Sequence, residues 1–111
     1  MQNTGSYDSV EKLYRIHEFQ VTVNGISFNR VRIDTHYEEK HKAVINDEII
    51  LELVRLLDHG YFMHVDIDED GFKYFVNDDW YLNGKPYRLV WGIPQDESYL
   101  GVRNAFRRRS R

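Results

Sequence analysis

The chain has 111 residues, of which 41% are hydrophobic, 14% aromatic and 30% charged, and its formal net charge is −3. This composition is typical of one soluble globular domain and excludes a disordered chain. The absence of cysteine excludes a disulfide framework, a thiolate metal cluster and a thiol nucleophile. No apolar run approaches the roughly 20 residues of a membrane span and no signal peptide is visible, so we expect a cytoplasmic protein without a membrane partner.

The charge is divided unevenly along the chain. Residues 1–102 carry 10 basic and 18 acidic side chains, whereas residues 103–111 carry five arginines and no acid. An arginine-rich end attracts phosphate groups, but an acidic body repels them unless its charge faces elsewhere. We interpret residues 107–111 as a basic tail that mainly aids solubility, and we expect residues 1–111 to form one domain in which residues 1–10 are frayed.

The first predicted element is a β-hairpin centred on Asn24-Gly25. Alternating segments at residues 16–23 and 26–33 flank this pair, and Asn-Gly in such a position is a strong signal for a two-residue turn. Val23 then lies opposite Ile26. If this register continues, it aligns Val21 with Phe28, Phe19 with Arg30, His17 with Arg32 and Ile16 with Ile33.

A long amphipathic helix is predicted within residues 43–60. Asn46 is suited to accept the first free backbone amides as the N-cap, and Gly60 is placed to end the helix. Apolar residues recur at helical spacing and form one broad stripe, which predicts that the helix packs on a sheet. The stripe comprises Ile49, Ile50, Leu53, Val54, Leu56 and Leu57.

The acidic run from Asp66 to Gly71 has the spacing with which a calcium-binding EF-hand loop begins. Position twelve, which requires a bidentate glutamate, is Asn77 and lies in a predicted strand. We therefore interpret the run as an acidic loop and predict no metal site there.

A second hairpin is predicted around Asn83-Gly84, followed by a last strand at residues 98–106. Pairing Leu82 with Lys85 sets the register of this hairpin. The register aligns Trp80 with Tyr87, Val76 with Trp91, Tyr74 with Ile93 and Asp79 with Arg88. Together the elements predict an α+β fold in which one long helix packs on a twisted, mainly antiparallel sheet of about five strands.

Two histidines, His36 and His41, stand in the polar segment THYEEKHK between the first hairpin and the helix. Their spacing of five residues excludes a zinc pair on one helical face. Asp34 and His36 are two residues apart at a strand end, so their side chains project on the same side. We predict a general acid or base here, either His36 or His41, with Asp34 and Lys40 in support. The alternative is that both histidines are simply solvated.

Three arginines near the C-terminus, Arg88, Arg103 and Arg107, are the predicted phosphate-binding residues. An ion pair with Asp79 is the alternative role for Arg88. Regular alternation in the last strand places Arg103 on the face opposite Asn104. The sequence lacks the motifs G-x-S-x-G, G-x-G-x-x-G and G-K-[ST]. Acid–base chemistry without a cofactor, such as the cleavage of RNA through its own 2′-hydroxyl, is therefore the enzyme class that these residues can supply.

The segments NGKPYRLVW and YLGVRNAFR, preceded by a histidine-bearing segment and a helix, resemble the RelE-like superfamily, which also includes barnase-like and colicin-type ribonucleases. The resemblance covers residues 36–107. It implies a metal-independent bacterial endoribonuclease or toxin, with RNA or a cognate antitoxin protein as partner. It also implies a site made of His36 or His41 with Arg88, Asn104 and Arg107.

Two other functions fit the same sequence. A protein-interaction module without catalytic activity would use exposed aromatic side chains such as those of Trp80 and Tyr81. An inhibitor would use the acidic residues 66–79 to mimic a nucleic acid and would bind a basic protein.

Overall fold

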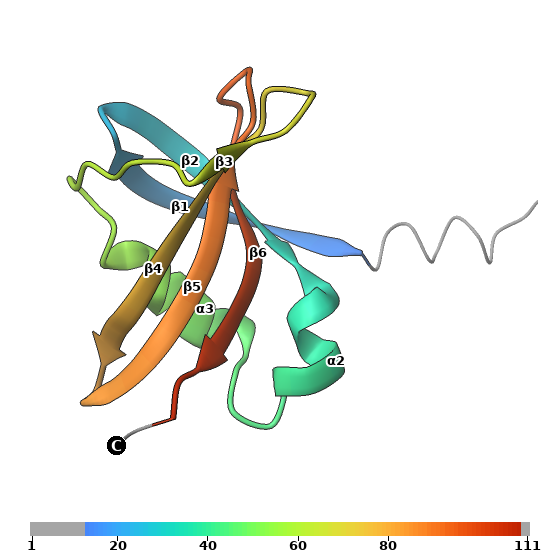
Figure 1. Cartoon of the computed structure of the whole chain (residues 1–111), viewed down its shortest axis with the longest axis vertical. Coiled ribbons are helices and arrows are strands. Elements are labelled where there is room, and N and C mark those ends of the chain that lie inside the picture. Colours follow the sequence, from blue (N-terminus) through green and yellow to red (C-terminus); the bar gives the residue numbers. More distant parts are fainter. Residues whose placement is uncertain (1–12, 110–111) are drawn as a thin grey trace, which may run out of the picture.

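The computed structural model describes residues 13–109, which form one six-stranded sheet with short helices (Figure 1). The strand order is β1–β2–β6–β5–β4–β3, and every neighbouring pair is antiparallel except β2 and β6, which are parallel. The strands are β1 (Tyr14–Val23), β2 (Ile26–Asp34), β3 (Asp66–Ile67), β4 (Lys73–Leu82), β5 (Lys85–Ile93) and β6 (Leu100–Arg107). The helices are the 3-10 turn η1 (Thr35–Tyr37), α2 (Glu38–His41) and α3 (Asp47–Arg55).

The predicted fold of one long helix on about five strands is wrong. Within residues 13–109 the sheet is mixed and dominates the fold, while α2 has four residues and α3 has nine. The apolar residues do continue at helical spacing past Arg55, but the backbone of residues 59 and 60 is hydrogen-bonded to the end of β1 and to its turn. His59 donates its backbone N–H to the carbonyl of Thr22 at 2.6 Å, and Asn24 donates to the carbonyl of Gly60 at 2.9 Å. Tertiary hydrogen bonds therefore end the helix before Gly60 does.

The start of α3 agrees with the sequence. The side-chain oxygen of Asn46 accepts a hydrogen bond from the backbone N–H of Ile49 at 2.8 Å, as expected of an N-cap. The inner side of the helix buries Ile50, Leu53 and Val54 completely. Helix α3 is thus fixed to the sheet by apolar burial, since a helix of this length is marginal alone.

The first hairpin keeps the predicted register only near its turn. Val23 pairs with Ile26 and Val21 with Phe28, but a β-bulge between Glu18 and Val21 shifts the pairing beyond it. His17 therefore pairs with Val31, and the predicted pairs of Phe19 with Arg30, His17 with Arg32 and Ile16 with Ile33 do not form. The bulge increases the local twist and allows β1 and β2 to bend around the core.

The second hairpin behaves in the same way. Leu82 pairs with Lys85 and Trp80 with Tyr87 as predicted, but a bulge between Asn77 and Trp80 breaks the register. Asp79, with a φ of 53°, lies inside this bulge, so it does not align with Arg88. Phe75, rather than Val76, pairs with Trp91, and the pair of Tyr74 with Ile93 is likewise absent.

One face of the curved sheet and α3 enclose a single core. The stacked rings of Phe75 and Trp91, 4.1 Å apart, lie within it, and the indole N–H of Trp80 donates to the carbonyl of Leu53 in α3 at 3.0 Å. In Figure 1, α3 lies behind β4, β5 and β6. We call the opposite face of the sheet, which points away from α3, the open face. Within residues 13–109, no helix is both long and apolar enough to cross a membrane.

The predicted basic tail is partly built into the fold. Arg107 is the last residue of β6, and Arg108 donates its backbone N–H to Pro86 at 2.8 Å and pairs with Asp78 at 3.1 Å. The rest of the predicted tail, residues 110–111, and the predicted frayed residues 1–10 lie outside the part of the chain that the structure describes.

Candidate functional site on the open face

Strand β6 carries three of the eight predicted site residues, Arg103, Asn104 and Arg107, and a bulge determines which face of the sheet each of them points to. Val90 of β5 pairs with Asn104 and Trp91 pairs with Val102, so Arg103 is an extra residue in β6. The bulge interrupts the alternation of the strand. As a result Arg103 is exposed on the open face together with Phe106, contrary to the regular alternation predicted from the sequence.

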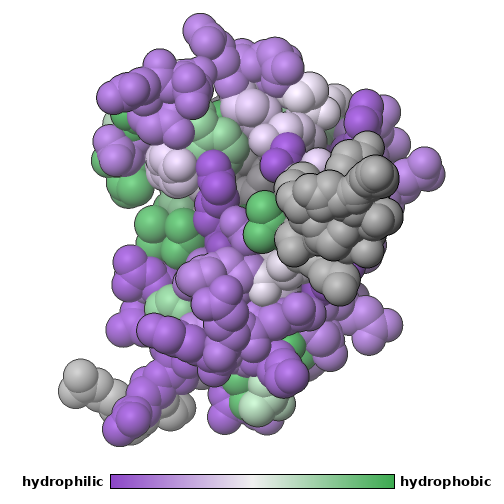
Figure 2. Space-filling view, turned by 90° about the vertical axis from the view of Figure 1, so that its right-hand side faces the viewer, coloured by the Kyte–Doolittle hydropathy of each residue, from purple (hydrophilic) through white to green (hydrophobic). Residues whose placement is uncertain are grey.

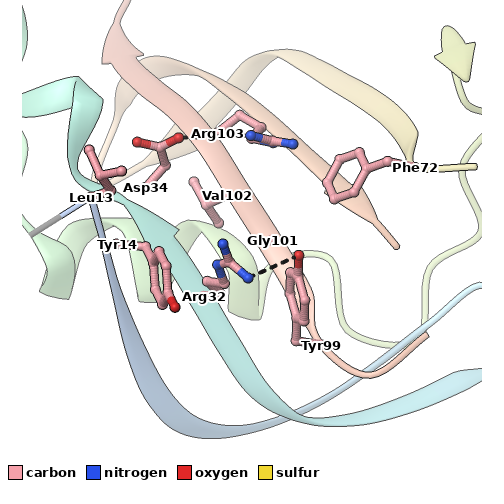
Figure 3. A pocket seen from close by; sticks show the side chains of 9 residues that line it. All are labelled: Leu13, Tyr14, Arg32, Asp34, Phe72, Tyr99, Gly101, Val102 and Arg103. Atoms are coloured by element: carbon pink, nitrogen blue, oxygen red, sulfur yellow. Dashed lines mark hydrogen bonds and ion pairs between the residues drawn. The ribbon is translucent and has the colours of Figure 1, made fainter. Parts of the chain in front are cut away.

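A shallow pocket of about 370 Å³ lies on the open face where β2 and β6 run side by side (Figure 3). Two arginines, one carboxylate and three aromatic rings form most of its wall. The lining residues are Leu13, Tyr14, Arg32, Asp34, Phe72, Tyr99, Gly101, Val102 and Arg103. The sheet separates this pocket from α3.

Arg32 is the central cation of this pocket. Its guanidinium lies 3.7 Å from the ring centroid of Tyr14 and 5.0 Å from that of Tyr99, and Nη1 donates to the Tyr99 hydroxyl at 3.3 Å (Figure 3). Within residues 13–109 it forms no ion pair with a carboxylate. Two tyrosine rings hold the group while its remaining N–H donors are available to an anion.

Sequence reasoning did not identify Arg32 as a site residue. The usable signal is its position between the core residues Val31 and Ile33, because a cation at that alternation must lie on the face opposite the core. The tyrosines that hold it come from distant parts of the chain and give no local signal.

The second cation of the pocket, Arg103, lies over the ring of Phe72 at 4.5 Å and donates to the Tyr74 hydroxyl at 3.4 Å. The ring of Phe72 lies close to β5 because Gly92 has no side chain. A Cβ atom on Gly92 would come within 2.1 Å of the Phe72 ring. Glycine at this position therefore lets an aromatic ring approach the strand and support Arg103.

Asp34 connects the pocket with His36. One carboxylate oxygen accepts the backbone N–H of His36 at 2.9 Å, and the other lies 3.9 Å from Nη1 of Arg103. The predicted proximity of Asp34 and His36 is therefore present, although the contact is to the backbone. The imidazole of His36 is 59% exposed and lies 3.5 Å from Glu39, which fits the alternative that this histidine is solvated.

His41 and Arg88, predicted from separate parts of the sequence, meet at one aromatic ring. The imidazole of His41 in α2 stacks on Phe106 with the ring centroids 5.1 Å apart, and the guanidinium of Arg88 in β5 lies 6.0 Å from the centroid of the same ring. Neither ring nitrogen of His41 has a hydrogen-bonding partner within residues 13–109. Arg88 pairs at 3.6 Å with Asp78, rather than with Asp79 as predicted.

The remaining predicted residues lie apart or are occupied. Asn104 faces the open side two residues before Phe106, and its side-chain oxygen accepts the backbone N–H of Ala105 at 2.9 Å. Lys40 is exposed on α2 without an ion pair in the described part of the chain. Arg107 follows Phe106 in the strand, so its side chain points to the other face of the sheet.

A second polar cluster, which sequence reasoning missed, lies on the α3 side of the sheet. The carboxylate of Asp47 hydrogen-bonds to Arg15 at 2.7 Å, His17 at 2.8 Å and Tyr37 at 2.8 Å, and Arg15 also pairs with Glu38 at 2.8 Å. Burial alone would raise the pKa of Asp47, but the hydrogen bonds from Arg15, His17 and Tyr37 outweigh it and hold that pKa well below its usual range.

The same cluster shifts the pKa of Tyr37. Burial, together with the hydrogen bond to Asp47, raises the pKa of Tyr37 to about 12. Every oxygen of Asp47 is occupied by a partner within the cluster. We interpret it as a structural connection that fastens the first turn of α3 and η1 to β1.

The acidic residues 66–71 form a turn that satisfies its own backbone. The carboxylate of Asp68 accepts hydrogen bonds from the N–H groups of Asp70 and Phe72 and from the Tyr74 hydroxyl. The hydrogen bond from Phe72 is the main cause that lowers the pKa of Asp68. Asn77, the residue at position twelve, accepts the indole N–H of Trp91 at 2.7 Å and is thereby engaged in the sheet.

The two aromatic residues expected in an interaction module differ in exposure. Trp80 is half-buried and fixed to α3 by its indole hydrogen bond, whereas Tyr81 is 59% exposed. Seen from the side of α2, the described surface is mostly hydrophilic, with apolar residues scattered among polar ones (Figure 2). A broad apolar interface is therefore not visible on this side.

Comparison of the chain with protein-family models, with curated proteins and with solved structures gave no match.

Proposed function

We propose that the protein is a metal-independent endoribonuclease of the RelE-like type, which binds single-stranded RNA along β6 on the open face. The observation that carries this proposal is the meeting of His41 and Arg88 at the ring of Phe106. A group that transfers protons and a cation that stabilises phosphate charge thereby lie next to the same aromatic ring. In this role the protein acts in the cytoplasm, and an antitoxin protein is its natural regulator.

Cleavage through the 2′-hydroxyl uses these two groups in a defined way. The 2′-oxygen forms a bond to phosphorus while the bond from phosphorus to the 5′-oxygen breaks; one proton leaves the 2′-hydroxyl and one is gained by the 5′-oxygen. His41 is the proton-transferring residue, because its ring nitrogens have no partner within residues 13–109 and histidine is the side chain most often used as a general acid or base. Arg88 stabilises the charge on the phosphate oxygens.

The ion pair of Arg88 does not oppose this role. Arg88 and Asp78 lie 3.6 Å apart and both side chains are about two-fifths exposed. An exposed pair of this kind contributes about 0–1 kcal/mol, so a phosphate can replace it at small cost. Asp78 also pairs with Arg108, which would keep the carboxylate neutralised when RNA binds.

The pocket around Arg32 supplies a second contact for the same strand of RNA. Arg103 and Phe106 are three residues apart in β6, which corresponds to about 10 Å in an extended strand. Arg32 and Arg103 are placed to bind a neighbouring phosphate, and the partly exposed ring of Tyr99 offers a surface on which a base stacks. Binding by stacked rings and arginines suits single-stranded RNA, whose bases are accessible.

The decisive experiment is a cleavage assay in EDTA with a fluorescent single-stranded RNA and a matched substrate that is 2′-deoxy throughout. Only the RNA should be cleaved. His41→Ala should lower the rate by about 10²–10⁴-fold, while RNA affinity stays within about twofold. His59→Ala is the matched control, because the His59 side chain is exposed and, within residues 13–109, its imidazole pairs only with the neighbouring Asp58. If the wild-type protein binds RNA without cleaving it, the proposed enzyme activity is wrong and the protein is an RNA-binding module instead.

Growth of cells that express the protein provides an independent measurement. Expression of the wild type should arrest growth, and Arg88→Ala should relieve the arrest as His41→Ala does. Arrest that persists in both variants would contradict the proposal, because the toxicity would then not depend on this site.

A further inference from the structure

Residues 61–67 display an apolar row that the proposed function does not use. Tyr61, Met63, Val65 and Ile67 are 79%, 87%, 65% and 46% exposed. They account for four of the nine large hydrophobic residues that are exposed within residues 13–109. Their regular alternation makes them a continuous row rather than scattered surface residues.

Two of the residues between them, Phe62 and His64, contact the core and hold the segment in place. The ring of Phe62 packs edge-on against Trp91 at 5.6 Å, and the ring of His64 packs edge-on against Phe75 at 6.3 Å. The side chain of Asn24 also accepts the N–H of Phe62 at 2.6 Å. The apolar row is therefore presented by a fixed, extended segment.

This segment lies at the edge of the sheet. β3 is the last strand in the order, and it pairs with β4 through only Asp66 and Ile67. The backbone N–H groups of Met63 and His64 have no hydrogen-bond acceptor within residues 13–109. Proteins usually protect such an edge with charged residues or proline, whereas an apolar edge with free donors is a template for another strand.

The charge next to the row indicates what kind of strand fits. Residues 61–71 contain four acidic side chains, Asp66, Asp68, Glu69 and Asp70, and no lysine or arginine. The same segment of a second copy would bring these four acidic residues and no lysine or arginine. We propose that residues 61–67 bind an extended segment of another protein, in which apolar residues alternate with lysine or arginine, by adding it as a strand to the sheet.

This inference is independent of the proposed ribonuclease. β3 is separated from β6 by β4 and β5, so a partner at the edge leaves the open face along β6 accessible. A variant at the edge should therefore change partner binding and leave RNA cleavage unchanged. One experiment can therefore contradict the proposed strand-binding edge while the proposed ribonuclease activity stands, and the reverse also holds.

The test uses a short acetylated peptide of alternating valine and lysine, added to the full chain and followed by NMR chemical shifts and fluorescence titration. The largest shifts should fall within residues 61–67. Met63→Ser should weaken binding by about tenfold, whereas Tyr81→Ser, which removes another exposed apolar side chain, should not. Two control peptides should bind at least tenfold more weakly. One alternates valine with glutamate, and the other is the lysine peptide N-methylated at every second amide.

Three results would overturn the inference. The first is no binding of the lysine peptide, and the second is binding that Met63→Ser or N-methylation leaves unchanged. The third is a wild-type dimer in sedimentation that Met63→Ser dissociates, because the row would then be covered by a second copy.

Discussion

The imidazole of His41 and the ring of Phe106 stack at a centroid distance of 5.1 Å and an angle of 29°, which links a four-residue helix to the last strand of the sheet. The contact fixes the ring plane of a histidine whose nitrogens remain unoccupied within the described residues. In the proposed cleavage reaction this contact would orient His41, and a reacting group loses efficiency when it is misplaced by about 1 Å.

Phe106→Leu keeps apolar volume but removes the stacked ring. It should lower the rate of RNA cleavage at saturation by about tenfold and leave RNA affinity within about twofold. Phe106→Tyr, which retains the ring, should keep most of the activity. Single-turnover kinetics over a range of pH values measure both effects. Equal loss in the two variants would show that the ring does not orient His41.

Arg32→Gln should weaken binding of single-stranded RNA by about tenfold at moderate salt. It should also reduce the slope of log affinity against log salt by about one, because one phosphate contact is lost. Arg55→Gln is the control, since Arg55 lies over Phe19, away from the open-face pocket. Fluorescence anisotropy at several salt concentrations measures the slope. An unchanged slope in Arg32→Gln would mean that this arginine does not contact phosphate.

Asp47→Asn should destabilise the fold by about 2–3 kcal/mol at neutral pH, because Arg15 and Tyr37 lose a charged acceptor. The folded-state pKa of Asp47 is lowered, so its contribution is complete above its unfolded value of about 4 and is lost as the pH falls below that value. Urea unfolding at pH 7 and pH 3 measures the difference. Glu48→Gln, an exposed neighbour in the same turn, should have little effect at either pH.

Tyr37→Phe removes the hydroxyl that donates to Asp47 at 2.8 Å and should cost about 1.5–3 kcal/mol at pH 7. The pKa of Tyr37 is raised to about 12, so its stabilising contribution is complete below the unfolded value of about 10 and is lost as the pH rises through 12. The difference in unfolding free energy between wild type and variant should therefore shrink above pH 10. A constant difference across this range would contradict the assignment.

Alanine substitutions at two glycines should destabilise the fold to different extents. Gly92→Ala places a Cβ atom 2.1 Å from the Phe72 ring and 2.5 Å from the backbone oxygen of Lys73, and it should destabilise by about 2–3 kcal/mol. Gly101→Ala meets its nearest atom, in Tyr99, at 3.2 Å and should cost about 1 kcal/mol or less. Thermal unfolding of the two variants tests the order.

Local chemistry was enough to predict the turns and the start of α3. Asn24-Gly25, Asn83-Gly84 and the N-cap Asn46 act through contacts within a few residues, and each is found where the sequence placed it. The registers beyond the turns could not be predicted in this way. The bulges depend on how each strand bends over a shared core, which involves residues far apart in the chain.

The candidate site was predictable to a similar extent. Residue type identified His41 and Arg88, but their meeting at Phe106 depends on strand order and on the bulge at Arg103. Arg32 was missed because its tyrosine partners are distant in sequence. The sequence pattern likewise predicted a helix that continues past Arg55. Apolar spacing does not reveal that the following residues form hydrogen bonds with the end of β1 and its turn.

The position of β6 has a consequence for how the protein is made. β6 is the last strand in the sequence, yet it lies between β2 and β5 in the sheet. During synthesis the two hairpins can each form from nearby residues, but they remain separate halves until the final strand has left the ribosome and inserted between them. Assembly of the sheet, and of the site on it, is therefore expected to wait until β6 is available.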